Sequence, residues 1–242
     1  MRNLSKRLAK LAPLTLLALA ACGGAALSEP PVRLEAVPTV STLASPASPG
    51  AERLRAGDLA AARAAFEAEL AGDAGRLAPL NDLAVTYLLE GHLDAAHRLL
   101  DAVVAQGSPE EQQAALVNLG ELYGLEGHRE AAQAYLESAR SLDEGRAGPL
   151  YALALLSDGR GDAAGARALL RRAVEADDGT ARGALAFAFP EEQRHLEAMV
   201  AEAAGDRAGA EARWRELSQG RFPALSASAA RHLRGLASTV GP

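Results

Sequence analysis

The sequence predicts an all-α protein made of stacked helix–turn–helix repeats. A similar phrase of fourteen residues occurs five times, beginning at Gly57, Gly91, Gly127, Gly161 and Gly205. The intervals between these glycines are 34, 36, 34 and 44 residues, and a period of this length is typical of solenoids. The runs before the phrases place apolar residues at helical spacing, as in Leu80, Leu83, Ala84 and Tyr87.

The first 21 residues have the pattern of an export signal. They carry the bases Arg2, Lys6, Arg7 and Lys10, no acid, and then an apolar run over 11–20. This run is too short to span a bilayer as a mature helix. It ends in Leu-Ala-Ala-Cys at Cys22, the only cysteine of the chain, so no intramolecular disulfide is expected.

This ending resembles the lipobox of bacterial lipoproteins. The resemblance implies cleavage before Cys22 and lipidation of its thiol, and several acyl chains would make the anchoring stable. The alternative is an ordinary cleaved signal followed by a chance cysteine. Gly23 follows the cysteine, where an aspartate would imply retention at the inner membrane. The resemblance therefore implies an outer-membrane, periplasm-facing lipoprotein.

Residues 22–50 are expected to form the lipidated end and a disordered tether. This stretch contains five prolines, no aromatic residue and no helical pattern. A flexible tether of this length would reach about 30 Å. The remaining chain after cleavage holds 21 bases and all 31 acids, a net charge of −10. Such a balance argues against nucleic acid or anionic lipid surfaces as partners.

Each repeated phrase has features of a helical hairpin. The glycine is expected to take the left-handed conformation that ends a helix. The next residue is expected at the N-cap of the second helix, at Asp58, His92, His128, Asp162 and Asp206. A small residue that permits close helix packing follows, at Ala62, Ala96, Ala132, Ala166 and Ala210. A large apolar residue completes the phrase, at Phe66, Leu100, Leu136, Leu170 and Trp214.

Several segments are expected to depart from the regular repeat over 51–238. Pro46 and Pro49 leave the first unit with little more than its second helix, at 58–70. An insert at about 177–190 contains Phe187 and Phe189 and precedes a leading helix at about 191–204. A capping helix is expected at 223–237, because a solenoid must cover its terminal apolar face, and residues 239–242 form a tail.

The pattern Leu-x2-Leu-Gly/Ala-x2-Tyr-x3-Gly-x4-Ala-x3-Leu resembles the tetratricopeptide repeat over about residues 51–219. The resemblance implies a concave groove lined by the leading helices, through Asn81, Val85, Leu88, Leu89, Val117, Glu121, Leu125, Tyr151, Leu155 and Asp158. Most of this lining is apolar and would suit an amphipathic helix or an extended apolar peptide. Glu121 and Asp158 argue against binding of a carboxylate. The alternative is that these side chains contact neighbouring helices.

Neither an enzyme active site nor a cofactor or metal site is expected. The chain contains no GxSxG, GxxxxGK[ST], HExxH or CxxC motif. His92 and His128 occupy helix starts, and His97 lies five residues from His92, the wrong spacing for a shared face. An enzyme would have to use Glu191 and Glu192 beside the insert.

The predicted function is a membrane-anchored periplasmic scaffold whose groove binds a protein or peptide partner of an envelope assembly. Its architecture is similar to that of pilotin-type lipoproteins of type IV pili, which escort a secretin. The alternatives are a docking adaptor for peptidoglycan enzymes and a self-assembling structural solenoid.

Overall fold

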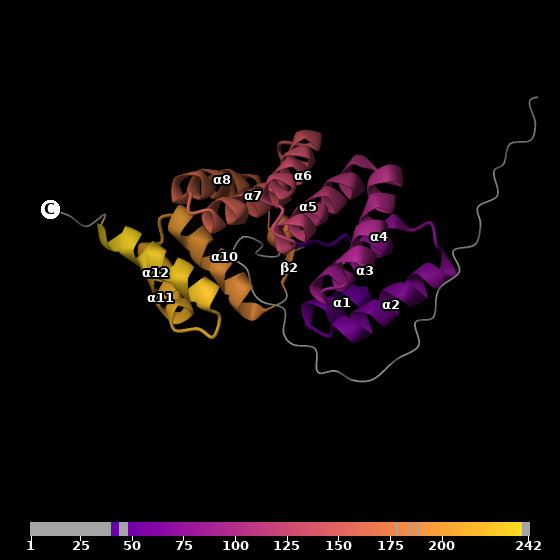
Figure 1. The fold of residues 1–242 in the computed structure, drawn as a ribbon, viewed down its shortest axis with the longest axis horizontal. Coiled ribbons are helices and arrows are strands. Elements are labelled where there is room, and N and C mark those ends of the chain that lie inside the picture. Colours follow the sequence, from indigo (N-terminus) through magenta and orange to yellow (C-terminus); the bar gives the residue numbers. More distant parts are fainter. Residues whose placement is uncertain (1–39, 44–47, 178, 184, 188, 239–242) are drawn as a thin grey trace, which may run out of the picture. The chain divides into compact units, whose positions relative to one another are not determined.

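The computed structural model describes residues 40–43, 48–177, 179–183, 185–187 and 189–238 (Figure 1). In this part the chain is helical apart from two short strands, which confirms the all-α prediction. The helices are α1 (Pro49–Arg55), α2 (Leu59–Gly72), α3 (Leu77–Leu89), α4 (Leu93–Gln106), α5 (Pro109–Leu125), α6 (Arg129–Leu142), α7 (Ala147–Gly159), α8 (Ala163–Ala176), α9 (Thr180–Gly183), α10 (Pro190–Ala203), α11 (Arg207–Ser218) and α12 (Pro223–Ser238). The strands are β1 (Val40–Ser41) and β2 (Leu185–Ala186).

The helices pack in consecutive pairs. The pairs are α1–α2, α3–α4, α5–α6, α7–α8 and α10–α11, and α12 packs on α11 and α10. Each pair contacts the next, through α2–α3, α4–α5, α6–α7 and α8–α10, and Figure 1 shows this succession of pairs. Contacts that run mainly between neighbouring units are the property of a stacked repeat.

The five repeat glycines end the leading helices as predicted. Their φ angles lie between 75° and 84°, a region that other residues resist. At Gly127, the amide of the following His128 donates to the Tyr123 carbonyl at 2.8 Å, and the Gly127 amide donates to the Gly124 carbonyl at 2.9 Å. These bonds satisfy carbonyls at the end of α5 that would otherwise lack partners.

The second helices begin at the predicted N-caps, but by two different means. The carboxylates of Asp58, Asp162 and Asp206 each accept a backbone N–H in the first turn. The imidazoles of His92 and His128 form no capping bond; their rings lie 6.1 and 6.2 Å from those of Tyr87 and Tyr123. The histidines therefore mark helix starts, as predicted, while their side chains contact the preceding helix.

The predicted packing residues form the cores between the helices. All five repeat alanines and all five large apolar residues of the phrases are buried. In α5, Gly120 takes the place of the alanine found in α3 and α7, and a methyl group there would lie 2.7 Å from Leu136 of α6. Each fully buried Leu or Phe contributes roughly 1.5–3 kcal/mol through removal of its surface from water.

The first unit has a leading helix, which corrects the prediction for 58–70. Ser48 caps α1 by accepting the Ala51 amide at 3.2 Å, and Pro49 occupies the first turn. Proline is compatible with that position because the first amides of a helix have no intrahelical partner. Leu54 of α1 packs in one core with Phe66 of α2.

The structure also differs from the expectation of a disordered tether up to residue 50. Residues 40–43 are extended, and β1 pairs antiparallel with β2 of the insert, with Val40 opposite Ala186 and Ser41 opposite Leu185 (Figure 1). β1 also packs against α5. The insert thus contains both a helical turn and a strand, and α10 and α12 lie within one residue of their predicted bounds.

The predicted signal at 1–21, Cys22, most of the tether and the tail at 239–242 lie outside the described residues. Among the helices that are described, none combines the length and the apolar character needed to cross a membrane.

Candidate functional site

The side chains predicted to line the groove are inside the protein in this structure. All are buried except Leu125, which is half-buried. Val85, Leu88 and Leu89 belong to a core with Leu54 and Phe66 of the first unit. In later units, Val117 packs in a core with residues of α6 and α7, and Tyr151 and Leu155 in another with residues of α8, α10 and α12. These apolar residues contact neighbouring helices, and partner binding by them stays a prediction.

One predicted groove residue belongs to a buried polar site that holds an extended segment of the chain. On α3 and α5, the Asn118 amide donates to Asn81 Oδ1 at 2.9 Å, and the Asn81 amide donates to Asp82 Oδ1 at 2.9 Å. The backbone amide of Leu43 donates to the same Asp82 oxygen at 2.8 Å. We call Asn81, Asp82, Asn118 and the paired strand β2 the strand site.

The strand site can accommodate a carboxylate in the interior because its oxygen is hydrogen-bonded. Asn81, Asp82 and Asn118 are fully buried, and a buried charge without such partners would be strongly unfavourable. The backbone amide of Leu43 is thus part of what satisfies Asp82. The site contacts backbone through a side chain, a mode that depends little on the sequence of the bound segment.

A second buried polar cluster joins the last helices. His232 of α12 stands between two carboxylates: its Nε2 lies 2.8 Å from Asp158 Oδ1, and its Nδ1 lies 2.7 Å from Glu202 Oε2. Asp158 Oδ2 also lies 3.2 Å from Nε2 of the fully buried His195 and accepts the Ser228 hydroxyl at 3.0 Å. We call Asp158, His195, Glu202 and His232 the terminal network.

The two histidines of the terminal network have pKa values shifted in opposite directions. Burial disfavours a charge on His232, but hydrogen bonds to Asp158 and Glu202 outweigh it and raise the His232 pKa to about 9. Burial lowers the pKa of His195 against its bond to Asp158. Burial alone would raise the pKa of Asp158, whereas the bonds to both histidines hold it below its usual range. The arrangement is an imidazolium between carboxylates, with a neutral His195 beside it.

This network connects α7, α10 and α12 through Asp158, Glu202 and His232. Ser228 donates to a carboxylate, so it lacks the histidine base that activates a serine nucleophile. The Trp214 ring stacks on His232 with centroids 4.2 Å apart, and its indole N–H donates to Glu202 at 3.1 Å. In the part of the chain that the structure describes, no three His, Cys, Asp or Glu side chains are placed to hold a metal ion.

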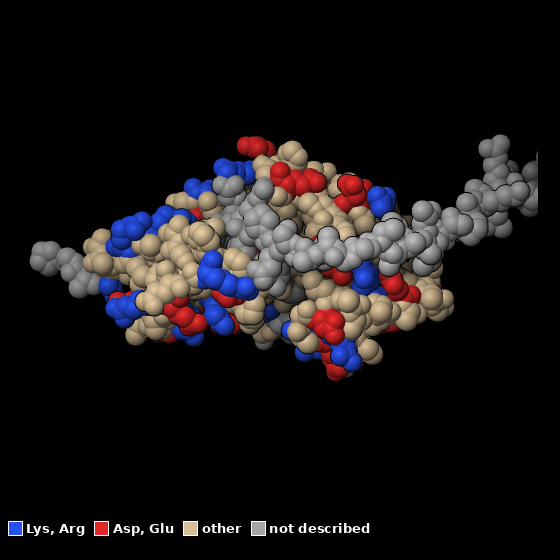
Figure 2. All heavy atoms as spheres, turned by 60° about the horizontal axis from the view of Figure 1, so that its bottom comes forward, with Lys and Arg blue, Asp and Glu red and all other residues tan. Residues whose placement is uncertain are grey.

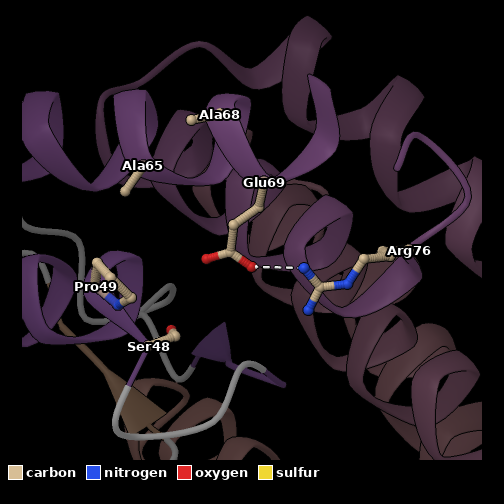
Figure 3. Close-up of a pocket in the computed structure, with 6 residues that line it drawn as sticks. All are labelled: Ser48, Pro49, Ala65, Ala68, Glu69 and Arg76. Atoms are coloured by element: carbon tan, nitrogen blue, oxygen red, sulfur yellow. Dashed lines mark hydrogen bonds and ion pairs between the residues drawn. The ribbon is translucent and has the colours of Figure 1, made fainter. Parts of the chain in front are cut away.

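An open hollow of about 500 Å³ lies beside the start of α1 (Figure 3). Its lining is formed by Ser48, Pro49, Ala65, Ala68, Glu69 and Arg76. Glu69 Oε2 is paired with Arg76 at 3.1 Å, so the charges at its rim largely cancel. The Ser48 hydroxyl at its edge accepts the Ala51 amide at 3.2 Å and caps α1.

The face shown in Figure 2 carries acidic and basic side chains in mixture, separated by uncharged residues. A continuous basic surface, which nucleic acid would require, is not present on that face.

Comparison with known proteins defines the fold. No protein-family model matches the chain, and no curated protein matches it. The solved structure of TTC0263, a thermophilic TPR protein of Thermus thermophilus, aligns with a TM-score of 0.53 and 22% sequence identity, over 76% of this chain and 95% of that chain. The fold is tetratricopeptide-like. The structure of MamA aligns with a TM-score of 0.40 and 20% identity, over 76% and 96% of the two chains.

The tetratricopeptide-like fold explains which polar residues the sequence interpretation missed. Asp82 and Asn118 are 36 residues apart, the same interval as Gly91 and Gly127, so they occupy equivalent positions in two apolar helices. That equivalence was a usable signal. His195, Glu202 and His232 had no such signal, because they meet only through the packing of α10 and α12.

Proposed function

We propose that this protein is a lipid-anchored scaffold of the bacterial cell envelope that binds other proteins through its tetratricopeptide-like repeats. The lipobox-like ending at Cys22 supports the anchor, and the absence of aspartate after it supports the outer membrane. The helix-pair architecture supports a role in protein contact, since stacked repeats form extended binding surfaces. Fold alone does not define a partner.

The observation that carries this proposal is the bond from the Leu43 amide to Asp82. A face of the repeat stack engages an extended backbone there, with a buried carboxylate as acceptor. A scaffold for proteins needs such a capacity. The partner we favour is a component of an envelope assembly, with a pilotin-like role toward a secretin as the specific hypothesis.

The anchor is tested with Cys22→Ser. Loss of the thiol should abolish lipidation and release the protein from membranes, while the melting curve of the folded part stays unchanged, because Cys22 precedes all the described elements. The measurement is the distribution between membrane and soluble fractions after a carbonate wash. Retention of Cys22→Ser in the membrane fraction would contradict the lipid anchor.

The partner is tested by affinity capture from detergent-solubilised envelopes. Recovery of a secretin supports the pilotin-like role, recovery of peptidoglycan hydrolases supports the docking adaptor, and recovery of a second, untagged copy of the protein supports self-assembly. Capture of nothing would count against a scaffold. Leu88→Asp and Leu155→Asp are unsuitable as binding-defective controls, because both leucines are buried and a charge there would unfold the protein. Asp82→Asn is the better control, since it changes the strand site with little change in volume.

A further inference from the structure

The strand site is occupied by the protein's own chain. Residues 40–43 lie 39 or more positions before Asp82 and about 145 before β2, yet they contact both. β1 packs against α5, whose Asn118 belongs to the same polar site. The bound segment reads Val-Ser-Thr-Leu and carries no charge, so its recognition rests on its backbone and shape.

The described attachment of this segment combines a short ladder with a backbone contact. Among the described residues, β1 and β2 pair over two residues each. The Leu43 amide adds a bond to the buried Asp82, and β1 packs on α5. Because the segment belongs to the same chain as the site, its local concentration at the site exceeds that of a free peptide.

The two elements that hold the segment can hold another segment equally well. β2 offers backbone groups on the edge that β1 covers, and such an edge pairs with any extended chain. Asp82 accepts the backbone N–H of Leu43, a donor that every residue except proline can supply. The negative charge of Asp82 disfavours an acidic occupant.

We propose that residues 40–43 are an internal, displaceable ligand of the strand site, and that the external partner is an uncharged extended polypeptide segment that replaces β1. The incoming segment pairs antiparallel with β2 and donates a backbone N–H to Asp82. This inference deepens the proposed scaffold function, on which it rests, by defining the kind of partner and the contact that competes with it. Since residues 40–43 lie within the predicted tether (22–50), occupation of the site by a partner would lengthen the free connection between anchor and repeats.

The test compares variants of the full chain that all carry Cys22→Ser. Leu43→Pro removes the N–H that Asp82 accepts and should open the site. Leu43→Ala is its matched control, since it retains the N–H and only shortens the side chain. Val40→Cys with Ala186→Cys places two thiols on opposed residues of the ladder, and oxidation should lock β1 in place.

The probe is a fluorescein-labelled peptide with the sequence of residues 38–45, Pro-Thr-Val-Ser-Thr-Leu-Ala-Ser. Its binding is measured by fluorescence anisotropy. Leu43→Pro should bind the peptide about ten- to hundredfold more tightly than the wild type, the value of roughly one hydrogen bond to a charged group. Leu43→Ala should stay near the wild type. The oxidised cysteine pair should not bind, and dithiothreitol should restore binding. Adding Asp82→Asn to Leu43→Pro should reduce the gain, because the neutral amide oxygen of asparagine accepts a weaker hydrogen bond than a carboxylate does.

Equal binding by all variants, or a gain in Leu43→Pro that Asp82→Asn leaves intact, would overturn the inference. The inference would also be overturned if sedimentation showed a wild-type dimer that Leu43→Pro dissociates. The occupant of the site would then be the strand of a second copy. Circular dichroism and melting curves verify that each variant is folded. The peptide experiment and the envelope capture can fail independently. If the variants bind the peptide as expected but no envelope partner is captured, the strand-site proposal stands and the scaffold role is refuted.

Discussion

At the scale of single residues, some side chains have a role that depends on neighbours in the sequence, and others have a role that depends on residues far away in the sequence. The backbone amides at a helix start donate to Asp58 or Asp206 wherever the helix lies. His232 is different, since its charge depends on Asp158, 74 residues earlier, and on Glu202, 30 residues earlier. Trp214 covers the ring and excludes water from this contact, which strengthens the electrostatic attraction.

Stability should depend on the protonation of His232. Its pKa of about 9 in the folded protein lies above the ordinary value of 6.5, so the folded state favours the imidazolium. This contribution is complete below pH 6.5 and is lost as the pH rises through 9. The free energy of unfolding should therefore fall by on the order of 2–3 kcal/mol over that interval, and His232→Gln should remove this dependence.

Urea denaturation at several pH values measures the effect. If the free energies of unfolding of the wild type and His232→Gln changed with pH in the same way between pH 6.5 and 9, the assignment of the imidazolium would be contradicted. Below pH 6.5 the sign reverses, because the lowered pKa of the buried His195 makes stability fall as the pH falls.

At the scale of elements, α1 shows how a helix can form where composition argues against it. Pro49 begins the helix at the one turn where proline is tolerated. Gly50 then passes so close to α2 that a methyl group on it would lie 2.4 Å from the buried ring of Phe66. The packing of this first pair thus requires a residue without a side chain.

Gly50→Ala should destabilise the protein by about 1–3 kcal/mol, the usual effect of an added group in a full core. Gly235→Ala in α12 is the matched control, since a methyl group there meets nothing within 4 Å. The control should be stabilising by about 0.5–1 kcal/mol through its helix propensity. Thermal or urea unfolding of both variants checks the prediction, and a stabilising Gly50→Ala would show that α1 does not pack on Phe66.

At the scale of the whole molecule, cohesion is local along the stack. Each helix pair contacts its neighbours, and four separate apolar cores follow one another through the described residues. The terminal network belongs to the last of them and joins α7, α10, α11 and α12 through Asp158, Glu202 and Trp214. A defect in this network should therefore loosen the last helices before the first ones.

Asp158→Asn should cost about 3 kcal/mol, because it leaves His232 partly without its counter-charge. Hydrogen exchange measured by mass spectrometry should accelerate in α10–α12 and stay unchanged in α3 and α4. Asp143→Asn, at an exposed position, is the matched control and should alter neither region. Uniform acceleration along the chain would show that the stack unfolds as one unit.

The repeat, its turns, its N-caps and the buried alanine and large apolar residue of each repeated phrase could be predicted from the amino-acid sequence, since these features depend on residues within one or two helical turns of each other. The position of some polar side chains was also predictable, because Asp82 and Asn118 share a repeat position. The contact of Leu43 with Asp82, the pairing of β1 with β2, and the bridge from Asp158 through His232 to Glu202 emerged only from the folded structure. These contacts span 30 to about 145 residues, and no local pattern records a partner at that distance.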